Sequence, residues 1–130
     1  MRIGSFSVDG TDSYSVITGG GIYNLGPQLG SLYPDLLAVI RGNGFDDVRN
    51  HIAHGEPDLQ IEDVRFLPLI TRPTTIYCAG RNYHDHVAEM RAGAVAPEFP
   101  TMFIKTMGSL VAHEDAVVKP KVSDCFDYEA

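Results

Sequence analysis

The character of the sequence changes near residue 72, and this change constrains the fold more than any other feature. Before it, short runs of alternating polarity are separated by glycines, whereas residues 75–79 form a nearly uninterrupted apolar run. Such a run is typical of a strand that is buried on both faces. We therefore predict two domains, residues 1–72 and residues 73–130. The second is predicted to be incomplete, because the chain stops within a further strand-like run, 126–130.

The first domain is expected to begin with an antiparallel meander. Residues 3–8 alternate in polarity with a period of two and end at Asp9-Gly10, a pair typical of tight hairpin turns. Two similar runs follow, at residues 14–17 and 22–25. Because antiparallel strands can be joined by very short turns, these three runs predict a small antiparallel sheet.

Two helices and an extended segment complete this domain. A proline and Asp35 open a helical stretch over residues 34–40, which glycines close. A second helix is predicted over residues 45–54, where apolar residues recur at the spacing of one helical face. Residues 64–70 are expected to be extended. The predicted fold class is therefore α+β.

The second domain is predicted to be richer in strands. Its first strand, 75–79, is followed by a short helix at 83–90 and then by strands at 101–105 and 116–118. The terminal run 126–130 again has the composition of a strand.

The composition describes an ordinary globular protein and excludes two classes of partner. Hydrophobic residues make up 44% of the chain and charged residues 21%, so disorder is not expected. The charge sum of 10 − 17 = −7 argues against binding to nucleic acid or to an anionic membrane.

The sequence also suggests a compartment. No apolar run approaches the ~18–20 residues of a membrane-spanning helix, and the start of the chain lacks the apolar core of a signal peptide. We therefore expect a cytoplasmic protein. The two cysteines, Cys78 and Cys125, are too few for a disulfide framework, and both are expected to be buried thiols.

One cluster of polar residues has the spacing of a catalytic pair. His86 and Glu89 lie three residues apart on the predicted helix that follows the strand 75–79, so their side chains can meet on one helical face. A carboxylate beside an imidazole orients the ring and stabilises its protonated form, as a general base requires. The same spacing also occurs on ordinary solvated helices, and that alternative stays open.

Two further candidates lie on predicted strands. Lys105 interrupts the apolar strand 101–105, either as an edge-strand lysine that points to water or as part of a site. Asp127 and Glu129 alternate on the terminal strand, so they share a face and could hold a divalent cation, although a solvated face has the same pattern.

Taken in order, these segments resemble the fumarylacetoacetate hydrolase family. The run Thr-Ile-Tyr-Cys-Ala-Gly-Arg-Asn-Tyr at 75–83, with His86, Glu89 and Met90, is similar to the opening of the family's catalytic domain. Met-Phe-Ile-Lys at 102–105 resembles its Phe-Leu-Lys segment, and Asp-Tyr-Glu-Ala at 127–130 the start of its Asp-Tyr-Glu-x-Glu metal motif. Residues 1–72 look like the small N-terminal domain that many members carry, so the resemblance covers the first half of a member.

The resemblance implies a mixed β-rich catalytic fold that binds Mg²⁺ or Mn²⁺ through two glutamates and a later aspartate. Glu129 matches the first glutamate, and the second would fall just after Ala130. His86 would then be the base and Glu89 its partner, on a segment that closes over the substrate. Substrate contacts are implied for a further set of residues: Arg81, Tyr83 and Lys105. Where members have proline and serine after the lysine, this chain has Thr-Met-Gly-Ser.

The function implied is that of a metal-dependent enzyme acting on a small 2-oxo acid, and a homodimer is expected. Its reaction would be C–C bond hydrolysis, decarboxylation or keto–enol isomerisation or hydration, with the degradation of aromatic compounds among the settings. The bound metal would stabilise the enolate that these reactions share. The alternative is a non-catalytic fragment or interaction domain, because one retained glutamate cannot hold a cation tightly. The 130-residue chain alone is expected to be inactive.

Overall fold

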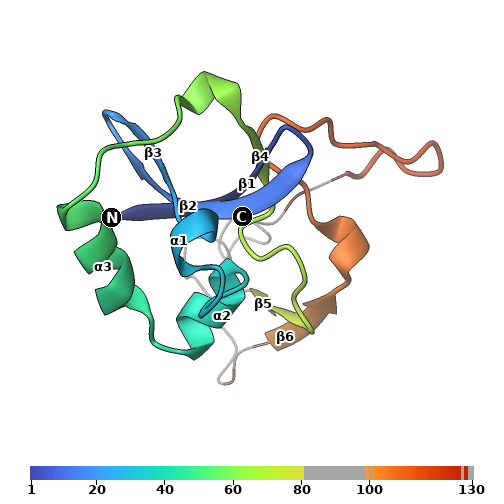
Figure 1. Ribbon diagram of the computed structural model, residues 1–130. Helices are drawn as coiled ribbons and strands as arrows, with labels where there is room; N and C mark the ends of the chain where they lie inside the picture. Colours follow the sequence, from blue (N-terminus) through green and yellow to red (C-terminus); the bar gives the residue numbers. More distant parts are fainter. Residues whose placement is uncertain (81–98, 100, 127, 129–130) are drawn as a thin grey trace. The chain divides into compact units, whose positions relative to one another are not determined.

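A computed structural model describes residues 1–80, 99, 101–126 and 128, and combines helices with antiparallel sheets (Figure 1). The predicted α+β class is therefore confirmed. The main sheet has four strands in the order β3-β2-β1-β4, and every pair in it is antiparallel. Its strands are β1 (Arg2–Val8), β2 (Thr11–Thr18), β3 (Gly21–Asn24) and β4 (Arg65–Leu67).

The turn between β1 and β2 has the conformation that its sequence predicts. Asp9 and Gly10 both have positive φ angles, 50° and 76°, and they connect the paired residues Val8 and Thr11. A two-residue loop with two positive φ angles matches the twist of the strands it joins. The predicted meander of three strands is confirmed.

The turn between β2 and β3 depends on a glycine with no room for a side chain. Gly21 has a φ angle of 131°, and a Cβ atom built on it would lie 2.7 Å from the carbonyl oxygen of Leu59. The approach is this close because the neighbouring Ile22 exchanges backbone hydrogen bonds with Leu59, at 2.9 and 3.2 Å.

Three helices and a single 3₁₀ turn connect β3 to β4. Asp35 caps α2, since its Oδ1 accepts a hydrogen bond of 2.7 Å from the N–H of Ala38. The predicted helices over 34–40 and 45–54 are confirmed as α2 and α3, whereas the one-turn α1 was not predicted. The bounds are α1 (Gly26–Leu29), α2 (Leu36–Arg41), α3 (Phe45–Ala53) and η1 (Ile61–Asp63).

The core lies between the helices and one face of the main sheet (Figure 1). Tyr14 and Val16 of β2 point to this side. Ile3 points to the same side, because it pairs with Val16 across the strands. The buried cluster consists of Tyr14, Val16, Leu25, Leu36, Val39 and Val48. Phe6 and Ile22 are fully buried but lie outside this cluster, so the sheet is covered on both faces there.

A second sheet has two antiparallel strands, β5 (Ile76–Gly80) and β6 (Thr101–Lys105), and η2 (Met107–Ser109) follows it. The predicted strand over 101–105 is confirmed. The chain divides into two compact units, Met1–Thr71 with Val111–Ala130, and Arg72–Leu110. The division into domains 1–72 and 73–130 stays a prediction.

Two sequence-based expectations about this region are wrong. β5 is not buried on both faces, because it pairs with β6 alone within the described residues and leaves Tyr77 67% exposed. Residues 116–118 form no strand. A strand needs a paired neighbour, and no described segment pairs with this one, so Val118 is 85% exposed.

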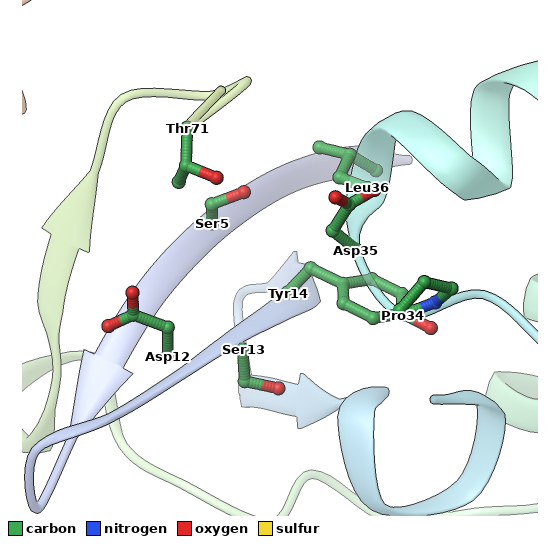
Figure 2. A pocket seen from close by; sticks show the side chains of 8 residues that line it. All are labelled: Ser5, Asp12, Ser13, Tyr14, Pro34, Asp35, Leu36 and Thr71. Atoms are coloured by element: carbon green, nitrogen blue, oxygen red, sulfur yellow. The ribbon is translucent and has the colours of Figure 1, made fainter. Parts of the chain in front are cut away.

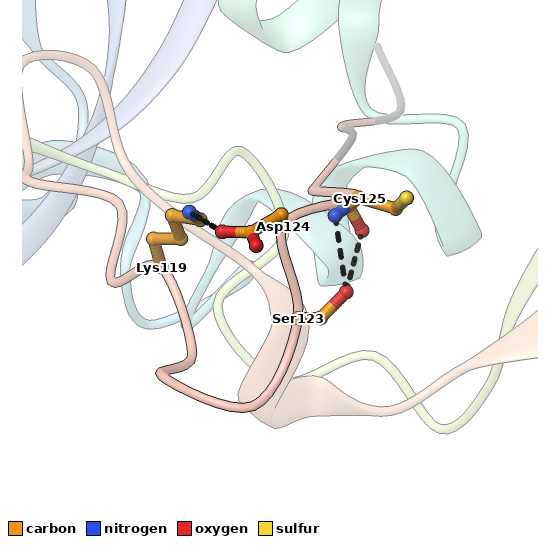
Figure 3. A network of polar contacts seen from close by, with 4 residues as sticks. All are labelled: Lys119, Ser123, Asp124 and Cys125. Carbon is orange, nitrogen blue, oxygen red and sulfur yellow. Dashed lines mark hydrogen bonds and ion pairs between the residues drawn. The ribbon is translucent and has the colours of Figure 1, made fainter.

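The expectation of buried thiols is also wrong. Cys78 is half-buried and Cys125 is exposed. Figure 3 shows the reason for Cys125: its N–H donates to Ser123 Oγ at 3.1 Å in a tight surface turn, next to an ion pair of 2.9 Å between Lys119 and Asp124. The thiol of Cys125 is exposed because this surface turn does not pack against the hydrophobic core.

No helix among residues 1–80, 99, 101–126 and 128 is long and apolar enough to cross a membrane.

Replacing Gly21 by alanine tests the junction between β3 and Leu59. We expect Gly21→Ala to lower the free energy of unfolding by about 3 kcal/mol, since it combines backbone strain with loss of the bonds to Leu59. Gly10→Ala is the matched control, because Gly10 also has a positive φ but no atom within 4 Å of a built Cβ. It should cost only about 1 kcal/mol. Equal losses in urea titrations of the two variants would contradict this account of Gly21.

Candidate functional site

The two faces of the β5–β6 sheet differ in exposure. In the register, Ile76 faces Lys105, Cys78 faces Phe103 and Gly80 faces Thr101, and cross-strand partners point to the same side. These residues share a face on which all except Thr101 are partly covered. The other face is exposed and carries Tyr77, Ala79, Met102 and Ile104. We take the more covered face as part of the candidate site, because it carries the predicted site residue Lys105.

Lys105 is the cation on this face. Its Nζ lies 5.9 Å from the centre of the Phe103 ring, two residues earlier on the same face. Among the residues that the structure describes, no carboxylate pairs with it. The side chain thus lies near an aromatic ring, and its assignment to a site stays a prediction.

The turn after Lys105 is closed by its own polar groups. The N–H and Oγ of Ser109 both donate to the carbonyl oxygen of Thr106, at 3.0 and 2.7 Å. Leu110 N–H likewise donates to Met107 at 3.1 Å. This compact 3₁₀ turn is the part of the chain where the sequence departs from the family pattern. The hydroxyl of Ser109 donates its hydrogen bond within the turn.

The remaining predicted site residues lie outside the described residues. They are Arg81, Tyr83, His86 and Glu89, together with Glu129 of the predicted metal motif. The structure therefore places Lys105 alone, and a site formed by these residues together stays a prediction.

The register nevertheless limits how such a site could form. Gly80, which precedes Arg81, and Lys105 lie on one face but at opposite ends of the two-stranded sheet. The distance between them along the strand is four residue steps, about 13 Å at ~3.3 Å per step. The start of the segment after Gly80 and Lys105 are therefore separated by the length of the strand.

The described residues contain no metal site of their own. No group of three His, Cys, Asp or Glu side chains among them could hold an ion. Tyr128 is the described member of the predicted motif at 127–130, and it is 80% exposed.

A small polar cavity lies elsewhere, beside the main sheet (Figure 2). Its volume of about 50 Å³ suits one or two water molecules and is far below the several hundred Å³ of ordinary ligand sites. The Asp12 side chain lines the cavity and has no hydrogen-bond or ion-pair partner among the described residues. The Asp35 side chain, which also lines it, caps α2. The lining residues are Ser5, Asp12, Ser13, Tyr14, Pro34, Asp35, Leu36 and Thr71.

The hydroxyl groups around this cavity serve the fold. Tyr14 donates to the carbonyl oxygen of Tyr33 at 2.6 Å, and Ser13 donates to Asn24 Oδ1 at 2.6 Å. Burial, with a smaller contribution from the nearby Asp35 charge, raises the pKa of Tyr14 to about 12. The phenol therefore stays a neutral donor at physiological pH, and the cavity is no candidate for an active site. Nothing in the sequence signalled it.

Comparison with known proteins identifies relatives of both parts of the chain. Residues 75–130 match the family model described as fumarylacetoacetate (FAA) hydrolase C-terminal. The chain is 35% identical over 115 residues to the human protein named oxaloacetate tautomerase FAHD2A, mitochondrial. The aligned region covers 85% of this chain and 35% of the relative. The bovine protein of the same name is 34% identical over 82 residues, 63% of this chain and 26% of the relative.

An archaeal relative matches a shorter part. An uncharacterized protein of Methanocaldococcus jannaschii is 38% identical over 58 residues, 45% of this chain and 24% of the relative. The chain thus spans about a third or less of the length of these relatives. No solved structure matches it significantly. The mitochondrial location belongs to the names of the mammalian proteins, and a cytoplasmic location for this chain stays a prediction.

If Lys105 serves a ligand and not the fold, its removal should leave stability unchanged. A partly exposed cation near an aromatic ring contributes only about 0.5–1 kcal/mol, so we expect Lys105→Met to alter the free energy of unfolding by no more than about 1 kcal/mol. Phe103→Ala, on the same face, is the comparison variant and should cost more because it removes apolar packing. A loss above about 1.5 kcal/mol for Lys105→Met in a denaturant titration would show that the lysine is structural.

Proposed function

We propose that this chain forms part of a longer enzyme of the fumarylacetoacetate hydrolase family, one that interconverts the keto and enol forms of a small 2-oxo dicarboxylate such as oxaloacetate. The observation that carries the proposal is the 35% identity, over 85% of this chain, to a human protein named as an oxaloacetate tautomerase. The family resemblance alone left hydrolysis, decarboxylation and isomerisation open. The relatives' names favour isomerisation.

Tautomerisation makes modest demands on the protein. A base removes a proton from C3 of the keto form, a proton is delivered to the C2 oxygen, and no bond between carbon atoms breaks. In this proposal His86 takes the C3 proton and Glu89 holds the imidazolium that results. The imidazolium then delivers a proton to the C2 oxygen, so one histidine with one carboxylate partner suffices, and no water molecule has to be activated.

The charge of the substrate explains the need for free cations. A 2-oxo dicarboxylate carries two negative charges, while the chain has a formal net charge of −7, so binding requires local positive groups. Lys105 supplies one on the more covered face of the β5–β6 sheet, with no carboxylate paired to it among the described residues. We assign the other to Arg81, whose guanidinium can hold a carboxylate with two hydrogen bonds, and Tyr83 would add a hydroxyl contact.

The metal requirement is proposed for the longer protein. A carboxylate such as Glu129 is the kind of ligand that Mg²⁺ and Mn²⁺ prefer, and the bound ion would act as a Lewis acid on the carboxylate and keto oxygens of the substrate. This chain contributes one such ligand, and the other two are expected beyond Ala130. We also propose a homodimer, which the resemblance implies.

Turnover of the full-length protein tests the proposed base. We expect enzyme-dependent loss of the enol absorbance of oxaloacetate, reduced ~10²–10⁴-fold by His86→Ala, the usual cost of losing a general base. His84→Ala is the matched control, since residues 84 and 86 would face apart on a helix. Lys105→Met should mainly raise KM, whereas Lys119→Met, at a lysine paired with Asp124, should not.

Two outcomes would contradict this assignment. Near wild-type turnover by His86→Ala would show that His86 is not the base and would favour an ordinary solvated helix. Enzyme-dependent release of carbon dioxide that is faster than the loss of enol absorbance would replace isomerisation by decarboxylation.

Metal binding tests the proposal that the site is shared with a continuation of the chain. Glu129 offers at most two oxygens, whereas Mg²⁺ prefers six ligands and gives up water reluctantly. We therefore expect calorimetry on the 130-residue chain to find no saturable Mg²⁺ binding at millimolar concentrations, and the full-length protein to bind. Glu129→Gln in the full-length protein should abolish that binding. Tight stoichiometric binding by the 130-residue chain would mean that it forms a complete site of its own.

A further inference from the structure

The compact unit that carries Lys105 is inserted into the other unit. The chain leaves the first unit after Thr71 and returns to it at Val111, so Arg72–Leu110 is flanked on both sides by segments of the first unit. How firmly those two flanking segments are attached decides how freely the ends of the insertion can move.

The segment before the insertion is attached to β1. The Oγ of Ser5, a buried residue of β1, donates a hydrogen bond of 2.7 Å to the carbonyl oxygen of Leu69. The next residue, Ile70, packs against the hydrophobic core. The chain is therefore fixed to within one residue of Thr71.

The segment after the insertion is attached to β4, which pairs with β1. Both carboxylate oxygens of Asp115 accept hydrogen bonds from the Arg65 guanidinium, at 2.9 and 3.0 Å. The His113 ring meets the edge of the Phe66 ring with centres 5.8 Å apart at 73°. Ala112 is buried, at 9% exposure.

These contacts converge on one polar turn. The N–H of Asp115 donates to the carbonyl oxygen of Ala112 at 3.2 Å, and Glu114 has a φ angle of 65°. An isolated surface ion pair contributes little. Here a two-bond ion pair, a ring contact and a buried alanine all act on four consecutive residues, 112–115, which makes the turn a defined attachment.

We propose that residues 112–115 form a clasp on β4 which, with the Leu69 attachment on β1, holds both flanks of the inserted unit on one pair of strands. The register places the two attachments close together, since Ser5 faces Leu67 and Ser7 faces Arg65. Where it concerns catalysis this inference rests on the proposed function: the inserted unit carries Lys105 and the predicted His86, so we expect the attachment of its flanks through Arg65 and Asp115 to influence substrate binding by that unit.

Hydrogen exchange on the full-length protein tests the clasp without reference to activity. The amide of residue 115 is the reporter, because its hydrogen bond closes the turn. Arg65→Asp and Asp115→Arg should each accelerate its exchange about two- to fivefold, the factor that corresponds to losing a favourable ion pair. The double variant, which reverses both charges, should restore protection. Lys119→Ala is the matched control, since it removes an ion pair of the same returning segment that does not reach the sheet.

Kinetics provide the second readout. Each single reversal should raise KM for oxaloacetate about two- to fivefold with kcat within twofold, and the double variant should restore KM. Unchanged exchange at residue 115 in both single variants, or no recovery in the double variant, would overturn the clasp. If the wild-type protein shows no tautomerase activity, the proposed function fails while the exchange result still decides the clasp. Should Arg65→Asp not fold, Arg65→Gln makes the same test.

Discussion

The pairing of β1 on both of its edges is the constraint on which the rest of the structure depends. β1 pairs with β2 along seven residues and with β4 along three. It contributes the fully buried Phe6 on one face and the buried Ser5 on the other. Through Ser5 it fixes the chain just before the inserted unit, and through β4 it supports the turn just after it. A single strand thus supports, within the first unit, the segments that precede and follow the second unit in the sequence.

Local signals in the sequence were sufficient for most elements of the first unit. Asp9-Gly10 predicted the hairpin because few other residues accept two positive φ angles in a row. Asp35 predicted the start of α2 because its carboxylate caps a free backbone N–H. The pairing of β4 with β1 could not be predicted in this way. It joins residues about sixty positions apart, and such a contact depends on the packing of everything between them.

Of the predicted site residues, Lys105 alone lies among the described residues, and its role stays a prediction. Lys105 stood out as a charge in an apolar strand, and the structure places it on the more covered face with no carboxylate beside it among the described residues. Burial was predicted less well. The run 75–79 has the composition of a central strand, yet burial depends on what covers a strand, and the chain spans about a third or less of its relatives' length. The pair Arg65–Asp115, fifty residues apart, left no pattern in the sequence.

The central proposal is that the longer protein of which this chain forms part moves a proton at C3 of a 2-oxo dicarboxylate and leaves the carbon skeleton intact. The most direct measurement follows oxaloacetate by NMR in D₂O with the full-length protein and Mg²⁺, with rates corrected for the uncatalysed reaction. The account predicts enzyme-dependent incorporation of deuterium at C3 while all four carbons are retained, and loss of that incorporation in His86→Ala. Enzyme-dependent formation of pyruvate ahead of deuterium exchange, or exchange no faster than without the protein, would contradict it.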